Sequence, residues 1–356
     1  MTRLVHLGLG NFFRAHQAWY TERANALQPE DPWTYTAFTG RSPALAAAMT
    51  AGGDRYTLIE RGASGDSAMT IRAVAHSIPG GDTDAWAAAL SEPELAVVTV
   101  TVTESGYGAE PSGAPARLLA GLAARRSAGG GPLALVSCDN LAGNGEVLHG
   151  AVVRLAEASD LELARWVEAN VTFPSTMVDR ITPHSGDPLT VVTEPFSEWV
   201  IAGGFPAGRP AWDEVGARFV DDVAPYERRK LWLLNAAHST MAYLGLLAGF
   251  ETVDQAWASP EIRATVEQLW GEVRPVLGFS DDETDAALAA LRPRFANPRI
   301  AHRLEQIARQ GREKLAQRQQ AIMATRVEAG LPPGEACQTT IAAFEDVVRK
   351  GQFRVD

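Results

Sequence analysis

The first half of the chain alternates short apolar runs with amphipathic stretches. The run Leu95–Val102 is β-branched and apolar on both faces, which is typical of a strand buried inside a parallel sheet. Strand and helix alternate from there in both directions, which predicts an α/β fold with a Rossmann-like, doubly wound parallel sheet. The other expected strands are Arg3–Leu7, Trp33–Phe38 and Pro132–Val136, and the expected helices are Ala15–Leu27, Pro115–Arg126 and Gly145–Ala158.

The pattern changes near residue 220. Beyond Pro225 the chain has almost no β-branched runs, and apolar residues recur at helical spacing. We therefore predict two domains, a Rossmann-type domain over 1–221 and an all-helical domain over 222–356. The helices expected in the second domain are Tyr226–Gly245, Pro260–Val276, Asp281–Leu291 and Pro298–Ala329.

Composition and charge narrow the class of protein. The 356 residues are 46% hydrophobic, and 43 acidic against 32 basic residues give a net charge of −11. This charge disfavours nucleic acid and anionic membranes as partners, while local basic residues leave a small anionic substrate open. Two distant cysteines, Cys138 and Cys337, predict no disulfide scaffold. With no leader pattern and no apolar run of about 20 residues, we expect a cytoplasmic enzyme.

A glycine turn follows the first expected strand and opens the first expected helix. Gly8 permits a tight turn, and Gly10 permits close approach of a pyrophosphate to the backbone. Phe13 stands where a third glycine is usual, so the motif alone is a weak signal. Its position in the first βα unit of an α/β chain strengthens it, and we predict dinucleotide binding here.

The second expected strand does not end in the acidic residue that usually holds the adenosine ribose. It runs into Arg41 and Ser42, which are suited to a 2′-phosphate and would favour NADP over NAD. The alternative is that Arg41 is a solvated loop residue. The cofactor is therefore predicted as NAD or NADP.

One helix carries an unusual set of polar side chains. At about 100° per residue, Lys230, Asn235 and His238 fall within an arc of roughly 140°. Their apolar neighbours indicate burial, and buried polar groups that cluster suggest a site. A desolvated lysine suits a general base near neutral pH, an asparagine amide can stabilise an alkoxide, and Glu227 lies one turn before Lys230 as a proton relay or an ion-pair partner.

Interpretations of the same helix that give its polar residues no catalytic role stay open. Lys230 can extend to solvent, and a lone histidine is more often a satisfied core residue than a catalyst. The spacing from Tyr226 to Lys230 also matches short-chain dehydrogenases. We discount that match because the stretch follows the end of the sheet and the glycine turn lacks the corresponding form.

The sequence resembles the polyol-specific long-chain dehydrogenases, the family of mannitol 2-dehydrogenase and fructuronate reductase. The resemblance covers nearly the whole chain, and Phe13 in place of a third glycine agrees with it. The motifs that carry it are Gly8-Leu-Gly-Asn-Phe-Phe-Arg-Ala-His-Gln-Ala18, Thr101-Val-Thr-Glu-Ser-Gly-Tyr107, Ser137-Cys-Asp-Asn-Leu141, Phe173 to Pro183, Val192-Thr-Glu-Pro-Phe196 and Lys230-x₄-Asn235-x₂-His238.

The resemblance implies metal-independent hydride transfer between NAD(P) and a polyol or sugar acid, by a protein that is a monomer. It implies that Lys230 is the general acid/base, that Asn140 and Asn235 hold the reacting oxygen, and that His238 orients the substrate. It places Asp179 beside the site and makes Lys314 a substrate-binding residue. Our assignments to the cofactor are Gly8, Gly10, Asn11, Phe12, Arg41 and Thr103.

Departures from the family pattern bear on the substrate. The chain is short between residues 40 and 130, Ser105 replaces a common lysine, and Gln306 replaces an arginine of mannitol dehydrogenases. Arg309 and Arg312 would suit a carboxylate and lean toward a sugar acid, unless they face solvent. A non-catalytic redox or sugar sensor is the alternative function. A metalloenzyme ranks third because the seven histidines are scattered.

Overall fold

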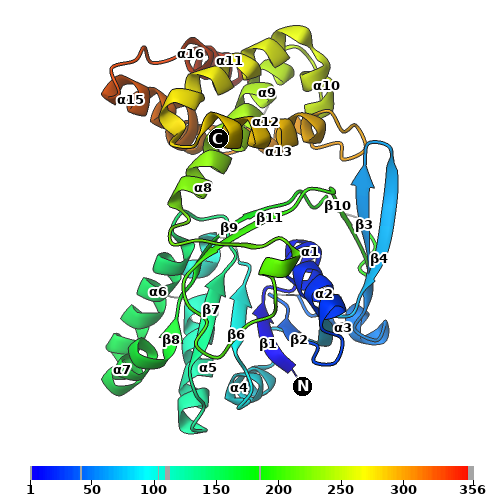
Figure 1. Ribbon diagram of the computed structural model, residues 1–356, viewed down its shortest axis with the longest axis vertical. Coiled ribbons are helices and arrows are strands. Elements are labelled where there is room, and N and C mark those ends of the chain that lie inside the picture. Colours follow the sequence, from blue (N-terminus) through cyan, green and yellow to red (C-terminus); the bar gives the residue numbers. More distant parts are fainter. Residues whose placement is uncertain (1, 41, 103, 109–112, 184–185, 352–356) are drawn as a thin grey trace. The chain divides into compact units, whose positions relative to one another are not determined.

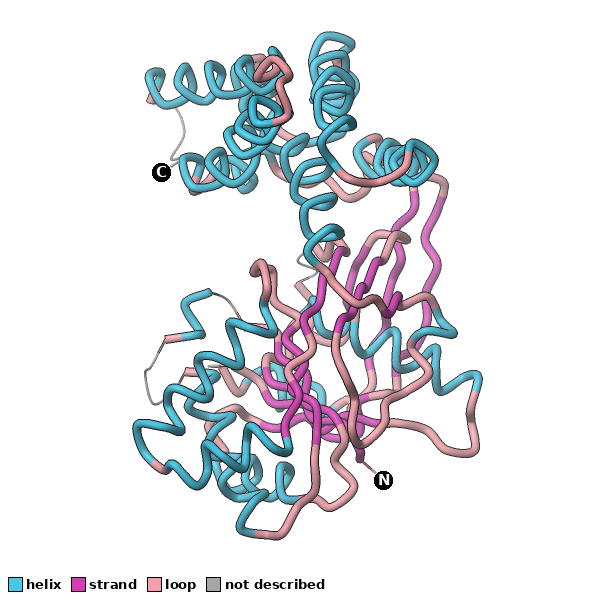
Figure 2. Tube along the Cα trace, turned by 60° about the vertical axis from the view of Figure 1, so that its left-hand side comes forward, coloured by secondary structure: helices cyan, strands magenta, loops and turns pink. Residues whose placement is uncertain are grey.

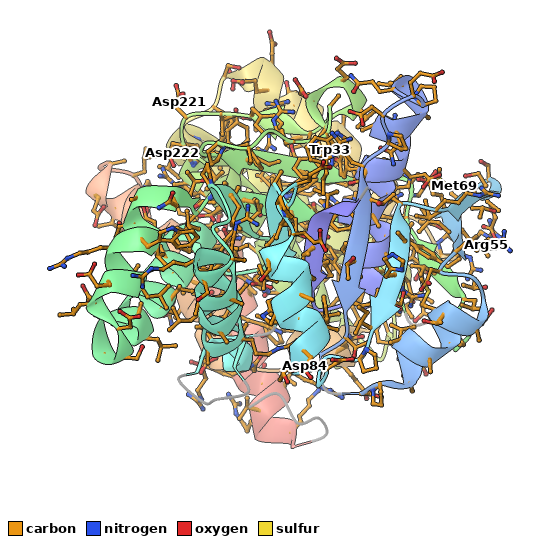
Figure 3. All side chains as sticks on the ribbon, turned by 90° about the horizontal axis from the view of Figure 1, so that it is seen from below. Trp33, Arg55, Met69, Asp84, Asp221 and Asp222 are labelled. Atoms are coloured by element: carbon orange, nitrogen blue, oxygen red, sulfur yellow. The ribbon has the colours of Figure 1, made fainter. Side chains whose placement is uncertain are left out.

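The computed structural model describes residues 2–40, 42–102, 104–108, 113–183 and 186–351. The chain forms two compact units (Figure 1). Unit 1 comprises Met1–Glu60 and Asp66–Ala224, and unit 2 comprises Arg61–Gly65 and Pro225–Asp356. The chain enters unit 2 after Asp221 and Asp222, which are both exposed (Figure 3). None of the helices within the described ranges is long and apolar enough to span a bilayer.

Unit 1 is built on a six-stranded sheet in the order β5-β2-β1-β6-β7-β8, in which every neighbouring pair is parallel. Counted along the chain, these strands lie in the order 3-2-1-4-5-6, which is the Rossmann arrangement. The predicted fold class is confirmed. The strands are β1 (Thr2–Leu7), β2 (Thr34–Phe38), β5 (Val74–Ile78), β6 (Val97–Val100), β7 (Leu133–Ser137) and β8 (Val171–Thr172).

Both faces of this sheet are apolar and covered, as expected for parallel strands. Along β1, Val5 and Leu7 join the core on one face while Leu4 joins the core on the other. Figure 2 shows helices on both sides of the magenta strands of unit 1. The first face packs against α4 (Thr83–Ser91), α5 (Ala114–Ser127), α6 (Asn144–Ser159) and α7 (Leu161–Asn170), and the second against α1 (Asn11–Ala15) and α2 (Gln17–Leu27).

Two smaller sheets of unit 1 were not predicted from the sequence, and neither were the helices α3, α4 and α7 or the strands β5 and β8 of the central sheet. The sheets have the orders β10-β3-β4 and β12-β11-β9. The second of them adds the buried Trp199 and Ile201 to the core that contains α1 and α2. The elements are α3 (Ala44–Ala51), β3 (Tyr56–Gly62), β4 (Gly65–Ile71), β9 (Ser175–Asp179), β10 (Thr190–Thr193), β11 (Glu198–Ala202) and β12 (Arg218–Phe219).

Unit 2 is helical apart from the tip of the β3–β4 hairpin. Its core gathers aromatic side chains from several helices, including Trp257, Trp270 and Phe295. Two further helical turns, η3 (Lys230–Asn235) and η4 (Ala316–Gln320), are π-helical. The α-helices are α8 (Ala224–Arg229), α9 (Ala236–Leu247), α10 (Val253–Ala258), α11 (Pro260–Leu277), α12 (Asp281–Phe295), α13 (Leu304–Ala308), α14 (Gly311–Leu315), α15 (Ala321–Glu328) and α16 (Glu335–Lys350).

The long helix predicted over Pro298–Ala329 is wrong. The segment is divided into α13, α14, η4 and α15, and positive φ angles at Ala301 (49°) and Gln310 (55°) interrupt it. Close packing accompanies the second break, because a Cβ on Gly311, directly after Gln310, would lie 2.3 Å from the Phe344 ring. The periodicity of the segment does not contain this tertiary contact.

The helix predicted over Ala15–Leu27 is also interrupted, at His16, where φ is −123° and ψ is −85°. The Ala15 carbonyl accepts a hydrogen bond from Arg180 Nη1 at 2.5 Å. The His16 ring packs against Trp199 with 5.5 Å between ring centroids. Partners from distant strands thus hold the chain at the break.

The hairpin tip is tied to unit 2 by side chains that follow α12. Asn297 Nδ2 donates to Arg61 O at 2.9 Å, and Arg299 Nη1 donates to Gly62 O at 3.0 Å. Unit 2 is therefore assembled from two separate stretches of chain.

Candidate active site

The glycine turn follows β1 and lies beside the carboxyl end of β6, where the direction of strand progression in the sheet reverses. Open α/β sheets bind ligands at this switch point. Gly8 has φ +113°, and a Cβ there would lie 2.0 Å from Thr101 O. The Gly8 amide donates to Phe38 O at 2.9 Å. Glycine at position 8 is therefore required by the protein itself, because the β1 turn touches the segment after β6.

A buried histidine supports this contact. His6 Nε2 lies 3.0 Å from Thr101 Oγ1, which itself donates to Gly8 O at 3.0 Å. Since that hydroxyl gives its only proton to Gly8, His6 Nε2 must be the donor to Thr101. Burial lowers the pKa of His6 to about 3, so the ring is neutral and keeps this arrangement over the working pH range.

Gly10 differs from Gly8. It caps α1 with an extended backbone (φ −151°), and a Cβ there would meet only Gly8 O, at 3.5 Å. No described protein atom requires a glycine at this position, whereas close approach of a ligand would. The buried Arg14 holds the same turn, since its Nε donates to Gly10 O at 3.3 Å and its Nη2 donates to Asn11 Oδ1 at 2.7 Å.

Of the three other predicted cofactor residues, the structure describes only Phe12. Phe12 is half-buried and stacks on His16 with 5.0 Å between ring centroids. Arg41 and Thr103 lie outside the described residues. Beside Arg41, the Ser42 hydroxyl accepts a hydrogen bond from the Ala44 amide at 3.3 Å, at the start of α3.

An acidic residue that was not singled out from the sequence stands at the carboxyl end of β7. Asp139 is buried and precedes the exposed Asn140. Its Oδ2 accepts hydrogen bonds from Tyr107 Oη and, at 3.0 Å, from Ser137 Oγ, while Oδ1 accepts from the Val102 amide at 2.5 Å. Asp139 thus joins the ends of β6 and β7 and fixes the loop that carries Asn140.

The Asp139 carboxyl should make stability depend on pH. Burial raises its pKa from 3.8 to about 6. Well below pH 4 the group is protonated in both states, and as pH rises through 4 toward 6 the unfolded state ionises before the folded state does. We expect the free energy of unfolding to fall by up to about 3 kcal/mol over that window. Urea titrations between pH 4 and 7 should show a smaller fall for Asp139→Asn, and an unchanged slope would contradict this role.

Asn144 connects the Asn140 loop to the strand that carries Asp179. Asn144 Nδ2 donates to Asp139 O at 2.9 Å and to Thr176 O at 2.8 Å, and its Oδ1 accepts from the Thr176 amide at 2.8 Å. Asp179 is buried at the end of β9. One buried amide therefore links the residue before Asn140 to the strand that ends at Asp179.

Arg180, next to Asp179, is a second residue that bonds distant segments near the site, and the sequence analysis did not single it out. Its side chain is fully buried and donates to Glu194 O at 3.1 Å and to Glu60 Oε1 at 2.5 Å. The guanidinium also lies 4.3 Å from the centre of the Trp19 ring. In the sequence it is marked only by its place in the motif from Phe173 to Pro183.

The helix that carries Lys230 is not a continuous α-helix. It passes from α8 through the π turn η3 into α9, and the Ala236 amide donates to Leu231 O, five residues back. Residues five apart, such as Lys230 and Asn235, are therefore one turn apart on the same side, whereas an α-helix would separate them by roughly 140°. Trp232, Leu233 and Leu234 are buried in succession, which the wider turn permits.

His238 lies three residues beyond the π turn, in α9. It is buried, and its Nε2 has no hydrogen-bond partner among the described residues. Its ring lies 5.1 Å from Phe295 and 5.2 Å from His302, measured between centroids. Burial, followed by nearby cationic groups, holds its pKa well below 6.5. The imidazole is therefore neutral and has a nitrogen free for a ligand.

Lys314 and Arg318 form a basic pair in α14 and η4. Lys314 Nζ donates to Ile307 O at 3.0 Å. Burial and then the charge of Arg318 lower the pKa of Lys314 to about 8, and burial lowers that of Arg318 to about 10. Arg309 and Arg312 are exposed, which favours the solvent-facing alternative for both.

The predicted site residues fall into two groups. Asn140, Asp179 and the glycine turn belong to unit 1, while Glu227 and Lys230 belong to unit 2 with Asn235, His238 and Lys314. Glu227, Lys230 and Asn235 are each partly buried. Within the described ranges, no three His, Cys, Asp or Glu side chains are grouped so that they could hold a metal.

A Rossmann sheet with a glycine turn at its switch point, joined to a helical unit with a Lys-Asn-His helix, defines the class of two-domain dinucleotide-fold proteins. Comparison with known families is more specific. Residues 2–214 match the Mannitol dehydrogenase Rossmann domain, and residues 222–343 match the Mannitol dehydrogenase C-terminal domain. The chain belongs to the mannitol dehydrogenase family.

Relatives of known name agree with this membership. Mannitol 2-dehydrogenase of Cereibacter sphaeroides is 39% identical, over 84% of this chain and 71% of the relative. D-mannonate oxidoreductase of Escherichia coli is 36% identical, over 89% of this chain and 74% of the relative. The structure of Pseudomonas fluorescens mannitol 2-dehydrogenase with NAD and D-mannitol has a TM-score of 0.84 at 30% identity, covering 98% of this chain and 79% of that one.

A substrate-free D-sorbitol dehydrogenase structure has a TM-score of 0.89 at 30% identity, over 98% of this chain and 80% of that one. The named relatives thus include proteins named for neutral polyols and one named for a sugar acid.

Proposed function

We propose that the protein is an NAD(P)-dependent oxidoreductase that interconverts a secondary alcohol and a ketone on a polyol or an open-chain sugar acid. The observation that carries the proposal is the match of both units to the two domains of one dehydrogenase family. Relatives named mannitol 2-dehydrogenase and D-mannonate oxidoreductase support the two substrate classes.

The glycine turn fits a dinucleotide. A glycine at position 10 is unexplained by protein contacts, and it is the residue that would let a pyrophosphate approach the backbone. Gly8, Gly10, Asn11 and Phe12 would hold the cofactor at the end of β1. When bound, the nicotinamide supplies or accepts a hydride. A relative's structure with NAD supports this cofactor, and NADP is the alternative.

The residues of unit 2 would handle the proton and the substrate. Lys230 would take the hydroxyl proton during oxidation and return it during reduction. Asn235, one π turn away, would hold the reacting oxygen together with Asn140. His238 is neutral with a free nitrogen, so it suits a hydrogen bond to a substrate hydroxyl without adding charge.

The remaining assignments are proposals of the same kind. Asp179 and Lys314 would bind substrate, and Glu227 would relay the proton between Lys230 and solvent. The exposure of Arg309 and Arg312 removes the earlier reason to favour a carboxylate. The choice between a polyol and a sugar acid therefore depends on experiment.

The direct test follows absorbance of reduced cofactor. Purified protein is mixed with fructose, fructuronate or tagaturonate, each with NADH and with NADPH. We expect consumption with at least one pair, at a rate well above that of Lys230→Ala. Consumption with a uronate alone would assign a sugar-acid reductase, and consumption with fructose a mannitol-type dehydrogenase. No consumption across a broad ketose panel, with cofactor bound, would contradict the proposal and favour a sensor.

A further inference from the structure

Two π turns contact each other in unit 2. One is η3, which carries Lys230 and Asn235, and the other is η4. π turns are rare, and a single turn of this kind inside an α-helix is frequent at functional sites. A π turn is less favourable than an α turn, so its persistence calls for interactions that stabilise it.

Side chains of η4 reach the end of η3. Arg318 Nη1 donates to Asn235 O at 3.1 Å and to Ser239 Oγ at 2.7 Å. The next residue, Gln319, donates from Nε2 to Ala236 O at 2.9 Å. Two successive side chains therefore bond two successive carbonyls, at the position where η3 returns to α-helical winding.

The buried setting strengthens these bonds. Gln319 is fully buried and Arg318 is partly buried. Burial lowers the pKa of Arg318, and the nearby Tyr243 hydroxyl acts in the opposite direction. The acceptors of Nη1 are the Asn235 carbonyl and the Ser239 hydroxyl, both uncharged. A charge-assisted bond in such surroundings is roughly twice as strong as a neutral one.

The register of η3 decides how Lys230 relates to Asn235 and His238. If the π turn relaxed to an α turn, every residue after it would rotate by about 100° relative to Lys230. The proton-exchanging amine and the groups that hold the substrate would then no longer face the same region. Contacts beyond the turn, on the Asn235 side, resist that rotation directly.

Resting on the proposed function, we propose that Arg318 is a positioning residue that, together with Gln319, holds η3 in its π register and thereby aligns Lys230 with Asn235 and His238. Removing its donors should misplace reacting groups by a fraction of a turn. Misplacement of about 1 Å can cost on the order of 100-fold in rate. The effect should fall on kcat more than on substrate KM.

A double-mutant cycle tests this role. We expect Arg318→Met to lower kcat about 10- to 100-fold. Ser239→Ala should lower it less, and the double variant should be no worse than Arg318→Met, because both act through one hydrogen bond. Arg318→Lys, which keeps one donor, should recover part of the loss. Arg263→Met, an exposed arginine on α11, is the control and should change nothing.

Other outcomes would overturn the proposal. A rise in KM at unchanged kcat would make Arg318 a substrate contact, and additive losses in the cycle would show that Ser239 is not its target. A kcat and KM in Arg318→Met equal to those of the wild type would show that Arg318 has no role in catalysis.

Amide hydrogen exchange provides a readout that does not require turnover. In Arg318→Met, amides of 236–240 should exchange faster than in Arg263→Met, at equal global stability. If the wild-type protein turns over no substrate, the proposed function fails, and hydrogen exchange still tests whether Arg318 holds η3 in its π register. Unchanged exchange in Arg318→Met would refute the positioning role of Arg318 even in an active enzyme.

Discussion

Replacing Lys230 with alanine is expected to lower turnover about 100- to 10,000-fold, with little change in cofactor affinity. The amine is the group that we assign to proton exchange, and the dinucleotide turn lies in a different unit of the chain. Lys230→Arg should be nearly as inactive, because a guanidinium keeps its charge but does not release its proton near neutral pH. Steady-state kcat and fluorescence titration with NADH measure the two properties separately.

Lys350→Ala is the matched control, since this lysine is exposed at the end of α16. Its kcat should equal that of the wild type. A near-normal rate in Lys230→Arg would show that positive charge, and not proton exchange, is what the position supplies.

Alanine at Gly8 is expected to destabilise unit 1 by about 3 kcal/mol or more. The new Cβ would lie 2.0 Å from the backbone oxygen of Thr101, and φ +113° is unfavourable for any L side chain. Alanine at Gly10 should change stability by less than about 1 kcal/mol, because its backbone is extended and its Cβ meets only Gly8 O at 3.5 Å. We expect it to weaken dinucleotide binding at least about tenfold instead.

Urea denaturation measures the stability of both variants, and cofactor titration measures their dinucleotide affinity. Gly131→Ala, at an exposed position where a Cβ meets nothing within 4 Å, controls for the loss of a glycine. Unchanged NADH and NADPH affinity in a folded Gly10→Ala variant would remove Gly10 from the cofactor site.

The central sheet was predictable because its strands are buried on both faces. The run around Val97–Val100 is apolar at every position but one, and such runs have few other interpretations. The small sheets were not predictable in the same way. Their strands alternate or carry polar residues, as in Gly65–Ile71, and the pairing of β10 with β3 joins segments more than 100 residues apart.

The site was predictable in residue type but not in geometry. The lysine, asparagine and histidine stand out as polar residues in an apolar helix. No local pattern predicts the π turn between Lys230 and Asn235. The side chains that bond its end, Arg318 and Gln319, lie about 80 residues later in the chain. Asp139 was missed for a related reason. Its importance lies in its bonds to Tyr107 and Val102, which only the folded sheet provides.

The hairpin tip at Arg61–Gly65 has a consequence for how the chain is made. During synthesis this pentapeptide leaves the ribosome long before Asn297 and Arg299, the side chains that bond its carbonyls. The helical unit therefore cannot be completed until more than 200 further residues have been added. A fragment that starts at Pro225 would lack a piece of its own structure, so vectorial folding ends with the late segment capturing an early one.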